Sequence, residues 1–333
     1  MDREQEQLQF LGFFGSIKES FKIIFSWKKI FTQITLTLIL PLSFIFLAHI
    51  QISQLLFFKI LHNTNTLDHT QFDSSKQHHL SDRISSQWIL FWLFKIVYFT
   101  FFLILYLLST AAVVYTIASI YTAKPISFKK VMSVVPRVWK RLLVTFLWSF
   151  AIVFVYIVVA IGILALLAVF VADSLIGIVI VIVIFILYLI GFVYISIVWQ
   201  LASVVSVLED KYGIKAMKKS RHLIKGKTGV AVAMFVLFTL CFTGIEIVFE
   251  EFVVLEWSPN LATSILVGIL CFVLLFVVIL FGLVVQTIIY FICKSYHHEN
   301  IDKSSLSDYL EVYLGDYLLL NKTRDVQLEQ FRV

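Results

Sequence analysis

The amino-acid sequence predicts an all-α, polytopic membrane helical bundle: six transmembrane helices in three repeats of an amphipathic interfacial helix plus a transmembrane hairpin. The 333 residues are 60% hydrophobic and only 14% charged, whereas soluble domains average about 45–50% apolar and 25% charged residues. Several uncharged runs exceed the roughly 20 residues needed to cross a bilayer. A basic segment, an apolar run, a turn and a second apolar run then recur in the same order.

The apolar runs define one membrane domain, 1–293, followed by a polar tail, 294–333. The six spans are expected at about 30–58, 88–121, 142–171, 175–208, 229–254 and 261–293. The third and fourth come from one run whose only charge is Asp173. Basic segments flank this run on both sides and should both be cytosolic, so the number of crossings between them must be even. Pro41 should kink the first span without breaking it.

Three basic segments, 10–29, 122–141 and 209–228, precede the hairpins. In each, apolar residues at helical spacing oppose lysines or arginines. Such a helix should lie at the membrane surface with its apolar face in the acyl boundary; the alternative is an ordinary solvated loop. The candidate residues for binding lipid headgroups are Lys28, Lys29, Lys129, Lys130, Arg137, Lys140, Arg141, Lys215, Lys218, Lys219 and Lys225.

Polar residues inside the expected spans suggest two kinds of contact. We expect Lys95 to pair with Glu246 or Glu250; alternatively, each side chain reaches the outer interface independently. The returning spans share polar positions near their cytosolic ends, namely Ser109, Thr110, Gln200, Ser203, Gln286 and Thr287. We expect these residues to form hydrogen bonds between helices. A substrate path would use similar residues.

The sequence contains no motif that predicts catalysis. HExxH, GxSxG, Walker and kinase signatures are absent, so we expect neither an enzyme nor a bound cofactor. Residues 61–87 carry histidines and aspartates at spacings that match no zinc site, which favours a mobile polar loop. The three cysteines give no disulfide framework. Cys293 is either a palmitoylation site or, as we favour, a buried small thiol.

The distribution of lysine and arginine predicts that both termini are cytosolic, in the endoplasmic reticulum or the plasma membrane. The protein has a net charge of +6, and its basic residues lie beside apolar spans. Anionic lipid headgroups are therefore the expected partners, not nucleic acid. Tyrosines and leucines at 309–318 predict a short amphipathic helix in the tail, through which protein partners could dock. Asn321 begins the only glycosylation sequon, and it should carry no glycan on the cytosolic side.

Two segments carry a resemblance to a known family. The stretch from Val207 to Lys227 and the tail segment Tyr309–Tyr317 resemble a plant family of uncharacterised multi-pass transmembrane proteins, some of them labelled as binding partners of a polyadenylate-binding protein. More distantly, the repeat is similar to the membrane region attached to bacterial glycerophosphodiester phosphodiesterases, whose catalytic barrel is absent here. The resemblance implies a membrane fold and no established activity.

Two functions follow as hypotheses. The first is a non-enzymatic membrane protein that organises lipids or partner proteins at the cytosolic face through its basic helices. The second is a transporter or channel for a small solute or a lipid. Lys95 and Glu246 support the second hypothesis, whereas the lack of glycine- or proline-broken half-helices at matching positions weakens it.

Overall fold

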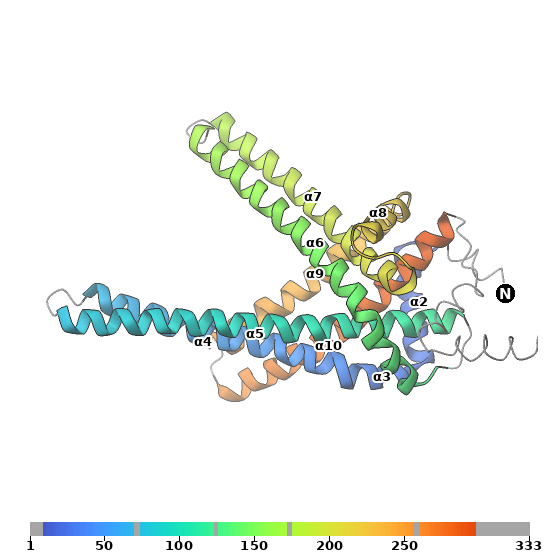
Figure 1. The fold of residues 1–333 in the computed structure, drawn as a ribbon, viewed down its shortest axis with the longest axis horizontal. Coiled ribbons are helices and arrows are strands. Elements are labelled where there is room, and N and C mark those ends of the chain that lie inside the picture. Colours follow the sequence, from blue (N-terminus) through green and yellow to red (C-terminus); the bar gives the residue numbers. More distant parts are fainter. Residues whose placement is uncertain (1–8, 70–73, 123–125, 172–174, 256–259, 298–333) are drawn as a thin grey trace, which may run out of the picture. The chain divides into compact units, whose positions relative to one another are not determined.

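The computed structural model of the protein describes residues 9–69, 74–122, 126–171, 175–255 and 260–297 (Figure 1). Within these ranges all regular structure is helical and no strand occurs, which confirms the predicted all-α class. The elements are α2 (Phe13–Ser26), α3 (Lys28–Ile34), η1 (Thr35–Ile39), α4 (Leu40–His69), α5 (Ser74–Tyr121), α6 (Phe128–Val171), α7 (Leu175–Leu208), α8 (Ile214–Leu223), α9 (Thr228–Phe249), η2 (Glu250–Val254) and α10 (Leu261–Tyr296). Here η marks a π-helix. The predicted tail helix and Asn321 lie outside the described residues.

Among the described residues, six helical stretches are long and apolar enough to cross a membrane. They cover Lys28–Thr66, Asp82–Tyr121, Phe128–Leu167, Ile176–Leu208, Thr228–Val254 and Leu261–Tyr296. Their number confirms the sequence prediction, and each predicted span overlaps one of these helices. The chain is therefore a multi-pass membrane protein.

The three repeats differ in how the basic segment joins its span. In the first repeat Trp27, with φ −117° and ψ 33°, separates α2 from α3. In the third repeat Gly226, at φ +90°, lies between α8 and α9. The separate helix expected at 122–141 is not observed, because α6 runs without a break from the basic residues into its span. Arg141 occupies the position that corresponds to Gly226, and a residue with a Cβ atom rarely adopts the left-handed backbone found at Gly226.

The first hairpin is more helical than expected. Residues 61–87 were expected to form a mobile loop, and this is wrong for the described residues, because α4 extends to His69 and α5 begins at Ser74. No glycine or proline interrupts this stretch, so no residue with strong helix-breaking propensity is present. Asn63 Nδ2 donates a hydrogen bond to Gln87 Oε1 at 2.9 Å and joins the two helices.

The chain passes through Pro41 without ending the helix, as expected. The departure from α-geometry precedes the proline, as the π-helical turn η1. A π-turn is one of the common causes of a local bend in a long helix. The described structure therefore keeps the first span continuous while changing its hydrogen-bond register next to the proline.

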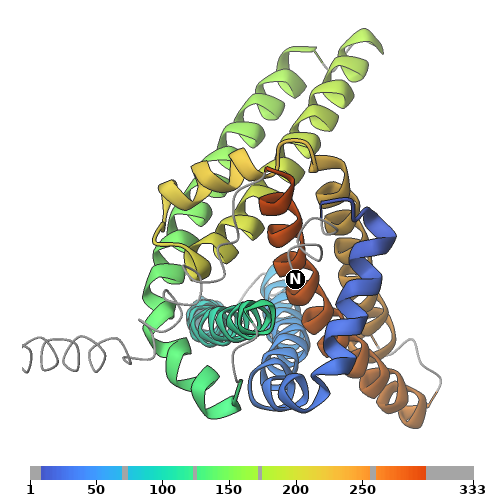
Figure 2. The same cartoon turned by 90° about the vertical axis from the view of Figure 1, so that its right-hand side faces the viewer.

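The chain divides into two compact units whose boundaries fall inside helices. Unit 1 comprises residues 1–34, 110–238 and 281–333, and unit 2 comprises residues 35–109 and 239–280. In unit 1, α6 and α7 form an antiparallel hairpin, and α8 packs against both helices (Figure 2). In unit 2, a core of Leu47, Ile245, Phe249, Cys271 and Leu275 joins α4, α9 and α10.

Candidate functional site

Helix α8 of unit 1 is attached to the α6–α7 hairpin through buried polar contacts. The backbone N–H of Gly213 donates to Thr145 Oγ1 at 2.8 Å, and Thr145 Oγ1 also lies 2.7 Å from Ser206 Oγ. Ser220 Oγ donates to the carbonyl of Val198 at 2.7 Å. Gly213 enters the helix at φ +61° and ψ −134°, a conformation that residues with a Cβ atom rarely adopt. The start of α8 is thus held against both helices of the hairpin.

The C-terminal end of α8 is held by His297, which follows α10. The Nε2 atom of His297 lies 3.1 Å from the carbonyl of Leu223 and 3.0 Å from that of Lys225. A carbonyl can only accept a hydrogen bond, so Nε2 carries the proton. Lys227 lies over the ring of Tyr296, 5.3 Å from its centroid. Carbonyls at a helix C-terminus lack partners within the helix, and this histidine supplies one.

The apolar side of α8 does not have the environment expected from the sequence. Ala216, Met217, Ser220 and Leu223 were expected to face lipid at the membrane surface, but they are buried inside the protein. They pack in the part of unit 1 formed by α6 and α7, where Ser149 Oγ lies 3.6 Å from the sulfur of Met217. The expectation is corrected, because an apolar helix face packs as readily on neighbouring apolar helices as on acyl chains.

The burial of this side leaves the basic side of α8 exposed. Of the basic residues proposed from the sequence, Lys28, Lys29, Lys129, Lys130, Arg137, Lys140, Lys215, Lys218 and Lys225 are exposed, and Arg141 and Lys219 are half-buried. Arg141 Nη1 forms an ion pair with Asp210 Oδ1 at 2.8 Å. Arg141 is therefore engaged within the protein, whereas Lys215 and Lys218 of α8 are exposed at the surface.

An acidic residue that the sequence analysis did not single out ties the α7–α8 connection to α10. Glu209 Oε1 accepts a hydrogen bond from the hydroxyl of Tyr290 at 2.8 Å and lies 3.6 Å from Lys294 Nζ. Lys211 Nζ lies 3.6 Å from the other carboxylate oxygen. In the sequence, Glu209 and Asp210 form an acidic pair directly before a run of lysines. This change in the sign of the charge could have identified Glu209 as a residue of interest.

Three of the six polar positions of the returning spans meet in unit 1 as predicted. Gln286 Nε2 donates to the carbonyl of Gln200 and to Ser203 Oγ, both at 2.7 Å. The amide thereby links α10 to α7. Ser109 Oγ, by contrast, is buried in unit 2 without a hydrogen-bond partner. The prediction of interhelical hydrogen bonds is confirmed for Gln200, Ser203 and Gln286.

Lys95 does not form the predicted ion pair. In unit 2 its ammonium lies 2.9 Å from His49 Nε2, and no ion pair with Glu246 or Glu250 occurs among the described side chains. Because the ammonium can only donate, the imidazole Nε2 is the acceptor. The His49 ring also stacks on Tyr98, with centroids 3.6 Å apart. A neutral imidazole satisfies the ammonium without burying a second charge, which makes it a less costly partner than a carboxylate.

Glu250 has a different partner from the one expected. Its Oε1 atom accepts a hydrogen bond from Gln54 Nε2 at 2.5 Å. The sequence analysis considered charged residues and the polar residues of the returning spans, and therefore missed His49, Gln51 and Gln54 in the first span. These three polar residues lie inside an apolar span, within a stretch of only six positions. This density of polar residues could have identified them from the sequence.

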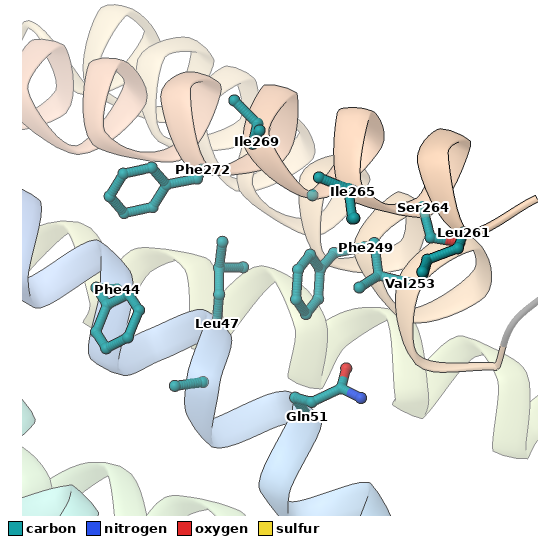
Figure 3. Close-up of a pocket in the computed structure, with 12 residues that line it drawn as sticks. Phe44, Leu47, Gln51, Phe249, Val253, Leu261, Ser264, Ile265, Ile269 and Phe272 are labelled. Atoms are coloured by element: carbon teal, nitrogen blue, oxygen red, sulfur yellow. The ribbon is translucent and has the colours of Figure 1, made fainter.

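Unit 2 also contains a groove beside its core, between α4 and the η2–α10 region (Figure 3). The groove has a volume of about 720 Å³, within the range of about 300–1,000 Å³ that is typical of small-molecule sites. Its lining residues are Phe44, Leu47, Ala48, Gln51, Phe249, Val253, Leu261, Ser264, Ile265, Gly268, Ile269 and Phe272. Ten of these twelve residues are apolar or glycine, and none is charged. Gln51 Oε1 is buried and has no hydrogen-bond partner.

Among the described residues no group of three or more histidine, cysteine, aspartate or glutamate side chains could hold a metal ion. Cys271 and Cys293 are buried, Cys241 is exposed, and none of the three forms a disulfide. The burial of Cys293 agrees with the favoured interpretation as a small buried thiol. The described residues thus include basic side chains at the surface and an apolar groove with a polar end.

Comparison with known proteins places the whole chain in one family. Residues 1–331 match the model of a family described as a domain of unknown function (DUF8558), so the chain belongs to that family. No curated protein and no solved structure matches the chain.

Proposed function

We propose that the protein is a non-enzymatic membrane protein that binds anionic lipid headgroups at the cytosolic face through the basic side of α8. The burial of the apolar side of α8 against α6 and α7 carries this proposal, because it fixes the direction in which Lys215 and Lys218 point. Each lysine or arginine near an anionic surface contributes about 1 kcal/mol of attraction. A helix held in one orientation loses little further freedom when it binds.

The orientation of the chain follows from the same proposal. With α8 and both termini in the cytosol, the connections that contain α2, the start of α6 and α8 are the basic ones, as the positive-inside rule requires. In this arrangement α2 and α8 are amphipathic helices attached to the membrane-embedded bundle, in the endoplasmic reticulum or the plasma membrane. The tail beyond α10 then serves as a docking segment for protein partners, as in the resemblance to the plant transmembrane family.

Native mass spectrometry of the detergent-solubilised full-length chain tests the proposal. The protein is titrated with phosphatidylserine and, separately, with phosphatidylcholine, for the native chain and for Lys215→Gln/Lys218→Gln. Loss of two charges worth about 1 kcal/mol each should weaken phosphatidylserine binding about thirtyfold. Binding of phosphatidylcholine should not change.

The matched control removes two exposed charges from the ends of the first hairpin, as Lys59→Gln/Arg83→Gln. It lowers the net charge by the same amount while leaving α8 intact, so phosphatidylserine binding should stay within about twofold of the native value. Equal weakening in both double variants would contradict the proposal, because it would mean that total charge, not the basic side of α8, controls binding.

A further inference from the structure

Helix α2 buries small side chains and exposes large aromatic ones. Ser16 and Ser20 are 0% exposed, and each hydroxyl donates to the carbonyl four residues earlier, at 2.9 and 2.7 Å. The phenylalanine row, which consists of Phe14, Phe21 and Phe25, is by contrast 82%, 48% and 70% exposed. A group of large apolar side chains at the surface marks a site of contact with a membrane or with another protein. The row is therefore a contact surface.

The residues around the axis of α2 occur in a definite order. At about 100° per residue, the phenylalanine row covers only about 40° of the helix circumference. Ile17 and Ile24 are half-buried and lie between the row and the buried serines. Lys18 and Lys22 are exposed and lie on the opposite side of the row. This order fits a helix that lies at a membrane surface beside a bundle, with its aromatic side in the acyl region and its lysines among the phosphates.

The position of α2 in the chain places it at the membrane boundary. Only Trp27 separates α2 from Lys28, where the first membrane-spanning stretch begins. Tryptophan and lysine are typical of the membrane–water interface. The ring of Phe21 lies 4.6 Å from the ring of Phe281 in α10, which is itself a membrane-spanning helix. The surroundings of the phenylalanine row are therefore lipid.

Helix α2 does not run parallel to the helices of unit 1 that it contacts. Trp27 has a non-helical backbone, at φ −117° and ψ 33°, and Figure 1 shows α2 at a steep angle to α3. Figure 2 shows α2 crossing the C-terminal half of α10. Fourteen residues form a helix about 21 Å long and about 10 Å wide. A helix of this size in the membrane plane takes up about 200 Å² of one leaflet.

The opposite leaflet receives no comparable helix from the described chain. At the far ends of the three hairpins, the connections between helices comprise residues 70–73, 172–174 and 255–260, so none is longer than six residues. They are too short to supply a second helix of fourteen residues. Helix α8 lies on the same side as α2, but its apolar side is buried against α6 and α7. Among the described elements, α2 therefore enlarges one leaflet only.

From these observations we propose that α2 is a wedge that concentrates the protein on curved membranes whose convex face is on the α2 side. Convex curvature separates the headgroups of that leaflet and uncovers acyl chains, and the phenylalanine row fills the resulting gaps. Interfacial amphipathic helices are sensitive to curvature for this reason. The buried serines hold α2 against the bundle, so the row loses little freedom on insertion. The exposed lysines beside the row favour lipid phosphates over a protein partner.

The proposal is tested with the full-length protein in giant vesicles of phosphatidylcholine, from which a narrow membrane tube is pulled. A membrane-impermeant dye is coupled to a tag after Val333, which lies on the same side as α2 because six spans separate them. Only molecules with α2 outside are then fluorescent. We expect their density on the tube to exceed that on the vesicle about fivefold, which corresponds to about 1 kcal/mol, less than the burial of one phenylalanine provides.

A control without any substitution uses the molecules of opposite orientation. The protein is labelled before reconstitution, and a membrane-impermeant quencher then removes the fluorescence of the outer dye. The remaining signal comes from molecules with α2 inside, where the leaflet of the tube is concave. These molecules should be depleted from the tube. This comparison does not depend on whether a variant folds.

Two double variants locate the effect. Phe14→Ala/Phe25→Ala should abolish the enrichment of outward-facing molecules, because it removes the two most exposed rings of the phenylalanine row. Phe154→Ala/Phe185→Ala is the matched control in unit 1, since it removes two exposed rings, 59% and 49%, from α6 and α7. The enrichment of this control should stay at the native value.

Three results would overturn the proposal: equal density of outward-facing molecules on tube and vesicle, equal enrichment of both orientations, or an enrichment that both double variants change to the same extent. The test is independent of the proposed headgroup binding by α8. Phosphatidylcholine vesicles carry no anionic lipid, so failure of curvature sorting would leave the phosphatidylserine titration untouched, and failure of that titration would leave the sorting experiment valid.

Discussion

Unit 1 and unit 2 are both built from long apolar helices, but they differ in how their buried polar side chains are satisfied. In unit 1, Thr145 contacts Ser206 and Gly213, and Ser220 and Gln286 donate to carbonyls of α7. In unit 2, the buried hydroxyl or amide oxygens of Thr35, Gln51, Ser53 and Ser109 have no hydrogen-bond partner among the described atoms. The same kinds of residue therefore have different energetic roles in the two units.

This difference separates polar groups that stabilise the helical bundle from polar groups that weaken it. Polar groups that bond to each other between helices stabilise the bundle, and their removal should be costly. A polar group that is buried without a partner lowers the stability of the protein. The network of unit 1 is thus structural, whereas the unpartnered oxygens of unit 2 are a cost that the rest of the unit offsets.

The largest expected effect is in unit 1, at the entrance to α8. Gly213→Ala forces a Cβ into a backbone at φ +61°, where it would lie 3.1 Å from Trp148 Cδ1. We expect the free energy of unfolding in detergent to fall by about 3 kcal/mol, the upper end for such backbone strain. Gly229→Ala in the same unit is the control, because its Cβ would meet nothing within 4 Å. Equal stability of the two variants would show that α8 is not held rigidly.

The next effect should come from the hydroxyl that connects α8 to the hairpin. Thr145→Val keeps the shape of the side chain but leaves the N–H of Gly213 without its acceptor. An unsatisfied buried donor costs about 1–3 kcal/mol, and we expect a loss of about 2 kcal/mol by the same unfolding measurement. If this variant were as stable as the native protein, the polar network of unit 1 would be dispensable. The two units would then not differ in the role of their buried polar groups.

A smaller effect is expected from the buried pair of unit 2. A double-mutant cycle with Lys95→Met and His49→Phe should give a coupling energy of about 1 kcal/mol, typical of hydrogen bonds within membrane bundles. The cycle is needed because each single variant also changes packing around Tyr98. A second cycle of Lys95→Met with Glu246→Gln should give no coupling. If coupling were found only in the second cycle, Lys95 would pair with Glu246, as expected from the sequence, and not with His49.

The smallest effect should come from Ser53→Ala, and its sign matters more than its size. Ser53 Oγ is buried without a partner, so removing it should leave the free energy of unfolding unchanged or raise it by about 0.5 kcal/mol. Ser206→Ala in unit 1, which removes the contact with Thr145, is the matched serine substitution and should destabilise. Destabilisation by both variants to the same extent would contradict the contrast between the two units.

Much of the fold could be predicted because the bilayer constrains long helices through simple properties. The length of the run 142–208, its single charge and its basic flanks predicted two membrane crossings. Helices α6 and α7 confirm this prediction. The join between the basic segment and the span in α6 was harder to predict. The sequence pattern of Trp139, Lys140 and Arg141 resembles that of Trp27, Lys28 and Lys29, yet the helix is interrupted at Trp27 and continues through Trp139.

The candidate sites were predicted less completely. The exposed lysines of α8 could be identified from helical periodicity alone, but periodicity reports only that a face is apolar, not whether lipid or protein covers it. Lys95 was recognised as an intramembrane charge, yet its partner is His49, because the nearest acceptor depends on how α4 and α5 pack. Gln51 belongs to a cluster of polar residues at 49–54, but the sequence does not show that its oxygen lacks a partner; this becomes visible only once neighbouring helices surround it.

By itself, the sequence determined the class of protein, the number of spans and the basic character of the connecting segments. These properties follow from local composition and from the free energy of placing apolar or charged residues in lipid. Only the tertiary structure decided that α8 rests on α6 and α7, that Gln286 links α10 to α7, and that Gln51 lines a groove. These features depend on contacts between residues far apart in the chain, and helical periodicity carries no information about which helix faces meet.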